Sequence, residues 1–270
     1  MKRVAPSAGF TIVETMIVLA VTGFMFMAVS VTWGGKQHKS DYQTAVRDVT
    51  SIIQQTVSDV QNGYFPSTDN FSCIGTSANL RFPSTPSTAK QGGNTTCQFM
   101  GKALEFRVSS DSPELMRKYT VAGWSNAGSD PPTSIAATQP TLAPRLTETL
   151  KLPFDLTTSS ITVNGSGGYV GVAFLIDVGS TTDSTGQLDS GRQVVKAYGL
   201  KSVLNDNDGL PIDGTFGLSL LSSNIINPAT PLTSGMQICM RSGGTQHFAV
   251  ITIGEGGNIT NVKSETRSSC

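Results

Sequence analysis

The chain has 270 residues, a formal net charge of zero and only 14% charged residues. This length requires no more than one globular unit with an appendage, and the neutral charge balance gives no global signal for nucleic-acid binding. Its many glycine, serine and threonine residues favour short strands and turns over a helical bundle.

A long apolar segment lies close to the N-terminus. From Phe10 to Gly35 the only charged residue is Glu14, and Lys2 and Arg3 precede the segment. As a helix, these 26 residues would extend about 39 Å, which exceeds a hydrocarbon core of about 30 Å. Basic residues before the segment, with the bulk of the chain after it, predict a cytoplasmic N-terminus and an exported C-terminal part.

Small residues that suit a processing site precede this segment instead of following it. An ordinary secretory signal has a shorter apolar stretch and a small-residue cleavage site at its far end. Here the far end, residues 32–36, reads TWGGK, whereas Ser7, Ala8 and Gly9 come before the apolar run. The pattern therefore does not favour a conventional secretory signal.

The stretch AGFTIVE at residues 8–14 resembles the processing site of type IV prepilins and the related pseudopilins. The resemblance covers residues 1 to about 35. It implies a leader peptide at 1–9, cleavage between Gly9 and Phe10 by a prepilin peptidase, and N-methylation of the new Phe10 amine. It also implies a transmembrane and polymerisation helix at 10–35, and as partners the membrane, an inner-membrane assembly platform, other copies of the chain and other pilins.

Glu14 is the residue of the apolar segment whose insertion into a membrane is unfavourable. A carboxylate near the middle of a membrane helix costs roughly 2.5–3.5 kcal/mol on insertion scales. The resemblance implies that the Phe10 amine neutralises Glu14 of a neighbouring subunit and so fixes the axial stagger, because a misplaced subunit would leave a carboxylate unpaired. The alternative is a protonated Glu14 that is merely tolerated.

The helical pattern continues beyond the membrane, over residues 36–62. No proline or glycine occurs from Lys36 to Gln61, and apolar residues recur at spacings of three and four, which predicts an amphipathic helix. Asn62-Gly63 is the expected C-terminal cap. The stripe comprises Tyr42, Ala45, Val46, Val49, Ile52, Ile53, Val57 and Val60.

Residues 63–270 change to short apolar segments separated by turn residues, so the predicted fold class is α+β: a long N-terminal helix packed on a β-rich exported head, as in type IV pilins. The run YVGVAFLIDV suits a central strand, and residues 83–96 and 125–144 are predicted as surface loops or linkers. The expected strands are 103–108, 115–122, 160–163, 169–178, 193–204, 216–221, 236–241, 247–253 and 258–263, the last two forming a hairpin.

Four cysteines lie in two separated pairs, Cys73 with Cys97 and Cys239 with Cys270. Neither spacing is that of a zinc site. In an exported chain the even number favours two local disulfides, although three connectivities are open and four free thiols are the alternative. Many pilins have a disulfide-bounded C-terminal segment that contributes to subunit contacts or adhesion; Cys239 to Cys270 resembles that arrangement in position only.

The sequence shows no persuasive catalytic set, and we expect no enzyme activity. His38 and His247 have no nucleophile or metal partner in sequence, and the glycines of residues 165–171 are misplaced for a phosphate loop, which favours a strand-entry turn. Residues 205–213 concentrate Asp206, Asp208 and Asp213. Calcium is one interpretation of this loop and a solvated turn is the favoured one, since the EF-hand template fails at its first position. No other cofactor is expected.

These observations predict a structural subunit of a type IV pilus or pilus-like filament, serving adhesion, motility or DNA uptake. The chain would reside in the cytoplasmic membrane before assembly and in an extracellular filament or a periplasmic pseudopilus afterwards. The alternatives are a pseudopilin of a type II secretion system and a minor or tip adhesin whose head binds DNA or a host-cell surface.

Overall fold

The computed structural model describes residues 11–63, 73–76, 79–82, 96–106, 113–125, 132–178, 194–201, 218–221, 225–229, 231–232, 235–243, 247–254, 259 and 261–270. The side chains of 31–37, 74–76, 79, 81, 144–146 and 218 are excluded. The chain divides into two compact units after Thr44. We call the second unit, Ala45–Cys270, the head.

Helix α1 extends from Ile12 to Gln61 without a break. Gly23 does not interrupt it. The helix ends where the sequence predicts, because the Asn62 amide still donates to the Ser58 carbonyl at 2.9 Å and the Gly63 amide donates to Val60 at 3.1 Å. Gly63 has a φ of 63°, the left-handed conformation that glycine adopts readily at a helix C-terminus.

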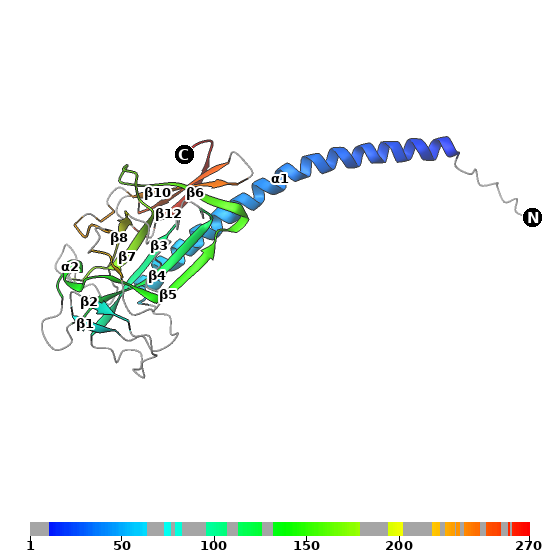
Figure 1. The fold of residues 1–270 in the computed structure, drawn as a ribbon. Coiled ribbons are helices and arrows are strands. Elements are labelled where there is room, and N and C mark those ends of the chain that lie inside the picture. The colour runs from blue at the N-terminus through cyan, green and yellow to red at the C-terminus, as the bar shows by residue number, and fades with distance from the viewer. Residues whose placement is uncertain are drawn as a thin grey trace, which may run out of the picture. The chain divides into compact units, whose positions relative to one another are not determined.

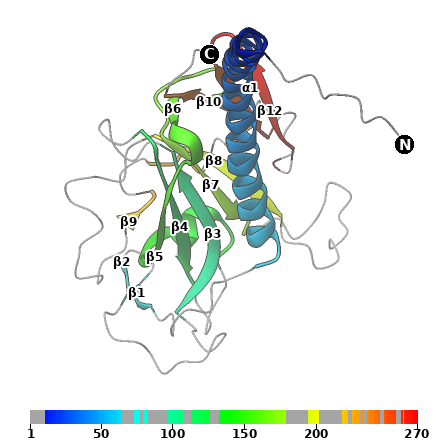
Figure 2. The same ribbon diagram turned by 90° about the vertical axis from the view of Figure 1, so that its right-hand side faces the viewer.

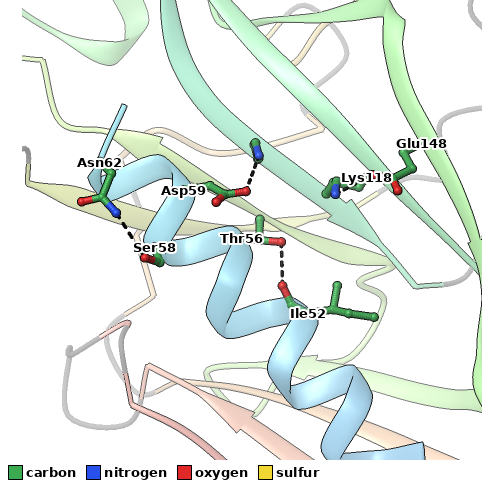
Figure 3. A network of polar contacts seen from close by, with 8 residues as sticks. Ile52, Thr56, Ser58, Asp59, Asn62, Lys118 and Glu148 are labelled. Carbon is green, nitrogen blue, oxygen red and sulfur yellow. Dashed lines mark hydrogen bonds and ion pairs between the residues drawn. The ribbon is translucent and has the colours of Figure 1, made fainter. Parts of the chain in front are cut away.

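The part of α1 that belongs to the head has one buried face. From Ala45 onward the predicted stripe is buried except for Ile52, which is half-buried, whereas Arg47 and Asp48 are exposed. Its polar contact with the head is an ion pair between Asp59 and Lys102 of strand β3 (Figure 3). The buried apolar residues in this part are Ala45, Val46, Val49, Ile53, Val57 and Val60.

Two larger antiparallel sheets form the head (Figure 1). The six-stranded sheet has the order β8 (Val195–Leu200), β7 (Gly171–Ile176), β3 (Cys97–Glu105), β4 (Leu115–Trp124), β5 (Thr141–Lys151) and β9 (Leu218–Ser219). The four-stranded sheet has the order β12 (Val262–Arg267), β11 (Phe248–Ile253), β10 (Met236–Ser242) and β6 (Leu156–Val163). A hairpin of β1 (Ile74–Thr76) and β2 (Asn79–Arg81) is separate.

Both faces of the six-stranded sheet are covered. Lys102 on one face of β3 reaches α1, while Ala103 on the other face lies opposite Tyr119 and Ala173 in the strand register. That second face packs with Ile135 of the short helix α2 (Ile135–Thr138) and with Leu220, Ile225 and Ile226. Burial on both sides explains why β7 is a continuous apolar run.

The four-stranded sheet contributes a smaller apolar face. Ile161, Ile238 and Ile251 are directly opposite one another on β6, β10 and β11, and all three are buried. Strand β12 lies at the edge, where five consecutive residues from Lys263 to Arg267 are exposed. Their alternating charges suit an edge strand, because charged side chains discourage further strand pairing.

Each strand that the sequence predicts overlaps an observed strand, with shifted ends, but the loop assignment of residues 125–144 is wrong in part. Helix α2 and the start of β5 lie within that range. Strand β5 was not predicted because Pro144 lies within it, and proline is rarely found inside a strand. In the structure Ala143 pairs with Thr120 and Thr147 pairs with Tyr119, so the proline falls in a bulge outside the ladder. The β1–β2 hairpin was also not predicted, and residues 83–95 lie outside the described residues.

Candidate assembly helix and head sites

The first unit presents an apolar helix with no protein cover. Within the described residues one helix, over Ile12–Ser30, is long and apolar enough to cross a membrane, with a mean hydropathy of 2.2 and none of its window buried. Phe24 is 81% exposed and Leu19 is 72% exposed. An apolar surface of this extent is a site for lipid or for other protein.

The hydroxyl groups of this helix are satisfied within it. Thr22 Oγ1 donates to the Val18 carbonyl at 2.8 Å, and Ser30 Oγ donates to the Phe26 carbonyl at 2.8 Å. Such bonds to the preceding turn remove the need for an outside partner. The helix surface is therefore compatible with an apolar environment everywhere except at its first turn.

That first turn contains Glu14, and Thr11 caps it. The Glu14 amide lies 3.3 Å from Thr11 Oγ1 and 3.1 Å from the Thr11 carbonyl oxygen. Thr11 and Glu14 thus have the T-x-x-E spacing of a capping box, a signal that the sequence analysis missed. A carboxylate in the first turn also gains about 0.3–1 kcal/mol from the helix dipole.

This local stabilisation is smaller than the cost of inserting a carboxylate, which reaches roughly 2.5–3.5 kcal/mol at a helix centre. Glu14 therefore still requires a compensating group if the helix enters lipid. Gly9 and Phe10, the predicted processing residues, lie outside the described residues, so the structure does not describe the Phe10 amine that the resemblance assigns to this role.

The structure pairs the four cysteines as the two local pairs. Cys73 bonds Cys97 with a Cα–Cα distance of 6.1 Å, and Cys239 bonds Cys270 with a distance of 5.9 Å. The first bond is buried in a cluster with Phe82, Leu80, Ala122 and Ala143. The second joins a buried residue of β10 to the exposed last residue of the chain, so it ties the end of β12 to its own sheet.

Two contacts between ionisable side chains lie on opposite faces of strand β3. Lys102 Nζ lies 2.5 Å from Asp59 Oδ2, and the two side chains are 5% and 21% exposed (Figure 3). On the opposite face Tyr119 OH donates to Glu105 Oε2 at 2.7 Å. Burial, together with the adjacent Glu105 charge, raises the pKa of Tyr119 far above its usual value. Neither Lys102 nor Glu105 was predicted as a site residue, although charged residues in an apolar strand are a usable signal.

A cavity of about 590 Å³ opens on the head beside α2. Ile135, Ala136, Tyr198 and Pro228 contribute to its lining. An ion pair between Lys196 and Asp177, with an Nζ–Oδ2 distance of 2.6 Å, lies in its wall. Burial and the Asp177 charge raise the pKa of Tyr198 to about 12. A second cavity of about 530 Å³ shares Pro228 and includes Lys201, Leu221 and Ile226.

The histidines, the glycine-rich turn and the candidate calcium residues are the remaining predicted sites. His38 and His247 are exposed. Residues 164–170 form the turn before β7, as expected for a strand entry. No group of three or more His, Cys, Asp or Glu side chains in the described part of the chain is arranged to hold a metal ion; Asp206, Asp208 and Asp213 lie outside that part.

A scan against protein-family models, a search of curated proteins and a search of solved structures found no match to this chain.

Proposed function

We propose that this chain is a type IV pilin-like filament subunit, which is cleaved after Gly9 and assembled through its N-terminal helix. The observation that carries the proposal is the AGFTIVE stretch at the start of an apolar helix whose Ile12–Ser30 window is entirely unburied. The apolar surface of this helix would be buried in lipid before assembly and against the helices of other subunits afterwards. An exported head with two disulfides suits the outside of a filament.

Glu14 distinguishes this function from simple membrane anchoring. In a simple anchor, the gain of about 0.3–1 kcal/mol from the helix dipole is the benefit of this carboxylate, whereas inserting a carboxylate costs up to roughly 2.5–3.5 kcal/mol, the value at a helix centre. In a filament the same carboxylate sets the register, because it must meet the amine of a correctly placed neighbour. The Thr11 cap accepts from the Glu14 amide, so the cost of the carboxylate remains to be offset by the neighbour.

Electron microscopy with gold-labelled antibody to the head tests the filament itself. We expect label along filaments on cells and in sheared supernatant, and loss of these filaments when the chain is deleted. Label confined to filament tips would support the minor or adhesive subunit instead. Label confined to the cell envelope, with no filaments, would contradict the surface-pilus proposal and favour a secretion pseudopilin.

Glu14→Gln tests the mechanism of assembly. The variant keeps the size and position of the side chain but removes the charge, so we expect normal membrane insertion and filament yield lowered at least tenfold. Thr22→Val is the matched control, because its hydroxyl bonds only within the same helix and its loss should leave yield unchanged. Normal yield from Glu14→Gln would contradict the proposed pairing.

A further inference from the structure

An exposed aromatic residue stands in a strained turn of the head. Phe154, between β5 and β6, is 55% exposed. Its φ is 53° and that of Asp155 is 51°, so two successive residues other than glycine adopt the left-handed conformation. For a bulky residue this conformation is a genuine outlier, and strain of this kind concentrates where a fold presents a functional group.

The surrounding structure holds this turn firmly. The flanking Leu152 and Leu156 are buried, and the Leu152 amide donates to the Glu114 carbonyl at 2.7 Å. The Asp155 carbonyl accepts from the Gly243 amide at 3.1 Å. Phe154 therefore projects from a fixed backbone, which lowers the entropy cost of using it as a contact.

Large exposed apolar side chains are scarce on the described part of the head. Apart from Phe154, only Val194 is exposed there, at 37%. Buried aromatic anchors commonly dominate protein interfaces. Phe154, exposed on a fixed backbone, is thus the residue of this described surface that best fits the role of an aromatic anchor in an interface.

The cavity beside α2 lies at the other end of strand β5. α2 directly precedes the strand and the Phe154 turn directly follows it. Figure 2 shows β5 beside β4 in the sheet. At about 3.3 Å per residue, and allowing for the bulge, roughly 30 Å separates the two ends. The anchor and the cavity of about 590 Å³ therefore cannot meet within one molecule.

The charges near the two sites are complementary. Asp155 is exposed next to the anchor. In the cavity wall the charge of Lys196 is balanced by Asp177 at 2.6 Å. The cation that is complementary to Asp155 is therefore the exposed Lys201, which lines the adjacent cavity that shares Pro228. Opposite charges across an interface favour one orientation of the partners.

We propose that the Phe154 side chain of one copy inserts into the cavity lined by Ile135, Ala136 and Pro228 of a second copy. The partner is a second copy because the anchor and the cavity are on one chain, at opposite ends of one strand. In a dimer joined by this contact, one copy still has a free Phe154 and the other a free cavity. Further copies can therefore add at both ends of the assembly, which forms an open helical polymer unless it closes into a ring. This inference rests on the proposed filament function and assigns a head contact to it.

Site-specific photo-crosslinking in cells that produce the full chain tests the contact directly. A benzophenone amino acid at position 154 keeps an aromatic side chain there. We expect a crosslinked dimer whose peptides join position 154 of one copy to residues 133–136 or 228–229 of the other. Crosslinks to another region of a second copy, to another protein or to lipid would overturn the inference, as would their absence from intact filaments.

Substitutions separate the anchor role from a role in folding. Phe154→Asn removes the ring but suits a left-handed backbone, so we expect an unchanged or higher melting temperature together with filament yield lowered at least tenfold. Ala136→Trp, which fills the cavity from an exposed position, should lower yield equally. Ala137→Trp on the same turn is the control, because Ala137 is exposed and does not line the cavity.

The outcomes distinguish this inference from the proposed function. Wild-type yield from Phe154→Asn or from Ala136→Trp, with filaments present, would overturn the head contact and leave the filament function intact. Absence of filaments from wild-type cells would contradict the filament function itself. A folded Phe154→Asn variant that lacks filaments, together with the expected crosslink, would support both.

Discussion

At the scale of single residues, the Asp59–Lys102 pair joins two charges of unequal burial. Lys102 is 5% exposed and Asp59 is 21% exposed. Asp59→Ala removes the carboxylate that lies 2.5 Å from a nearly buried ammonium group, so we expect it to lower the free energy of unfolding by about 3 kcal/mol. Lys102→Met leaves a carboxylate that water reaches and supplies an apolar side chain, so we expect a loss of about 1 kcal/mol. Chemical denaturation of the purified full chain in detergent measures both.

The control for this asymmetry is the Lys118–Glu148 pair. Its atoms are also 2.5 Å apart, but its side chains are 26% and 53% exposed. Lys118→Met should therefore change the free energy of unfolding by less than about 1 kcal/mol. A loss from Lys102→Met that equals or exceeds the loss from Asp59→Ala would show that burial of the ammonium is not the controlling factor.

Residue by residue, the sequence predicts features with a local signature and misses those that depend on distant partners. Gly63 could be assigned as a helix cap because the helical stripe ends beside it. Thr11 had an equally local signal, the spacing to Glu14, which was overlooked. Phe154 had none, because only the folded turn reveals its exposure and its positive φ.

At the scale of elements, β3 and β7 approach each other through glycine. Gly101 has a φ of 149°, and a Cβ there would collide with the carbonyl oxygen of Phe174 on β7. Gly101→Ala should therefore lower the free energy of unfolding by about 3 kcal/mol or more, through backbone strain and overpacking. The expected fall in melting temperature is about 6 °C or more. Gly167→Ala serves as the control because its Cβ would lie in open space, and a comparable fall in that variant would refute the argument.

Elements were predictable where one periodicity dominates. The unbroken apolar run of β7 indicated an interior strand, and β7 indeed lies between β3 and β8. Strand β5 was missed because Pro144 interrupts its pattern, and the pairing register that places this proline in a bulge is a tertiary property. The pairing of β5 with β9 joins segments far apart in sequence, so no local pattern indicates it.

At the scale of the whole molecule, α1 serves the two units in different ways. Its Ile12–Ser30 part is unburied, whereas Val49, Ile53, Val57 and Val60 are at most 2% exposed in the head. Burying four such side chains contributes about 8 kcal/mol at roughly 2 kcal/mol each. That sum is comparable with the entire net stability of a typical domain, about 5–15 kcal/mol.

The head should therefore fold without the first unit but not without its share of α1. We expect a chain that begins at Ala45 to be soluble without detergent and to melt cooperatively, because the apolar stripe still covers the sheets. A chain that begins at Asn62 retains every strand and both disulfide pairs but lacks that stripe, so it should aggregate or fail to melt cooperatively. Sedimentation and thermal melting of the two chains provide the measurement. Cooperative melting of the shorter chain would show that the sheets form a stable core without α1.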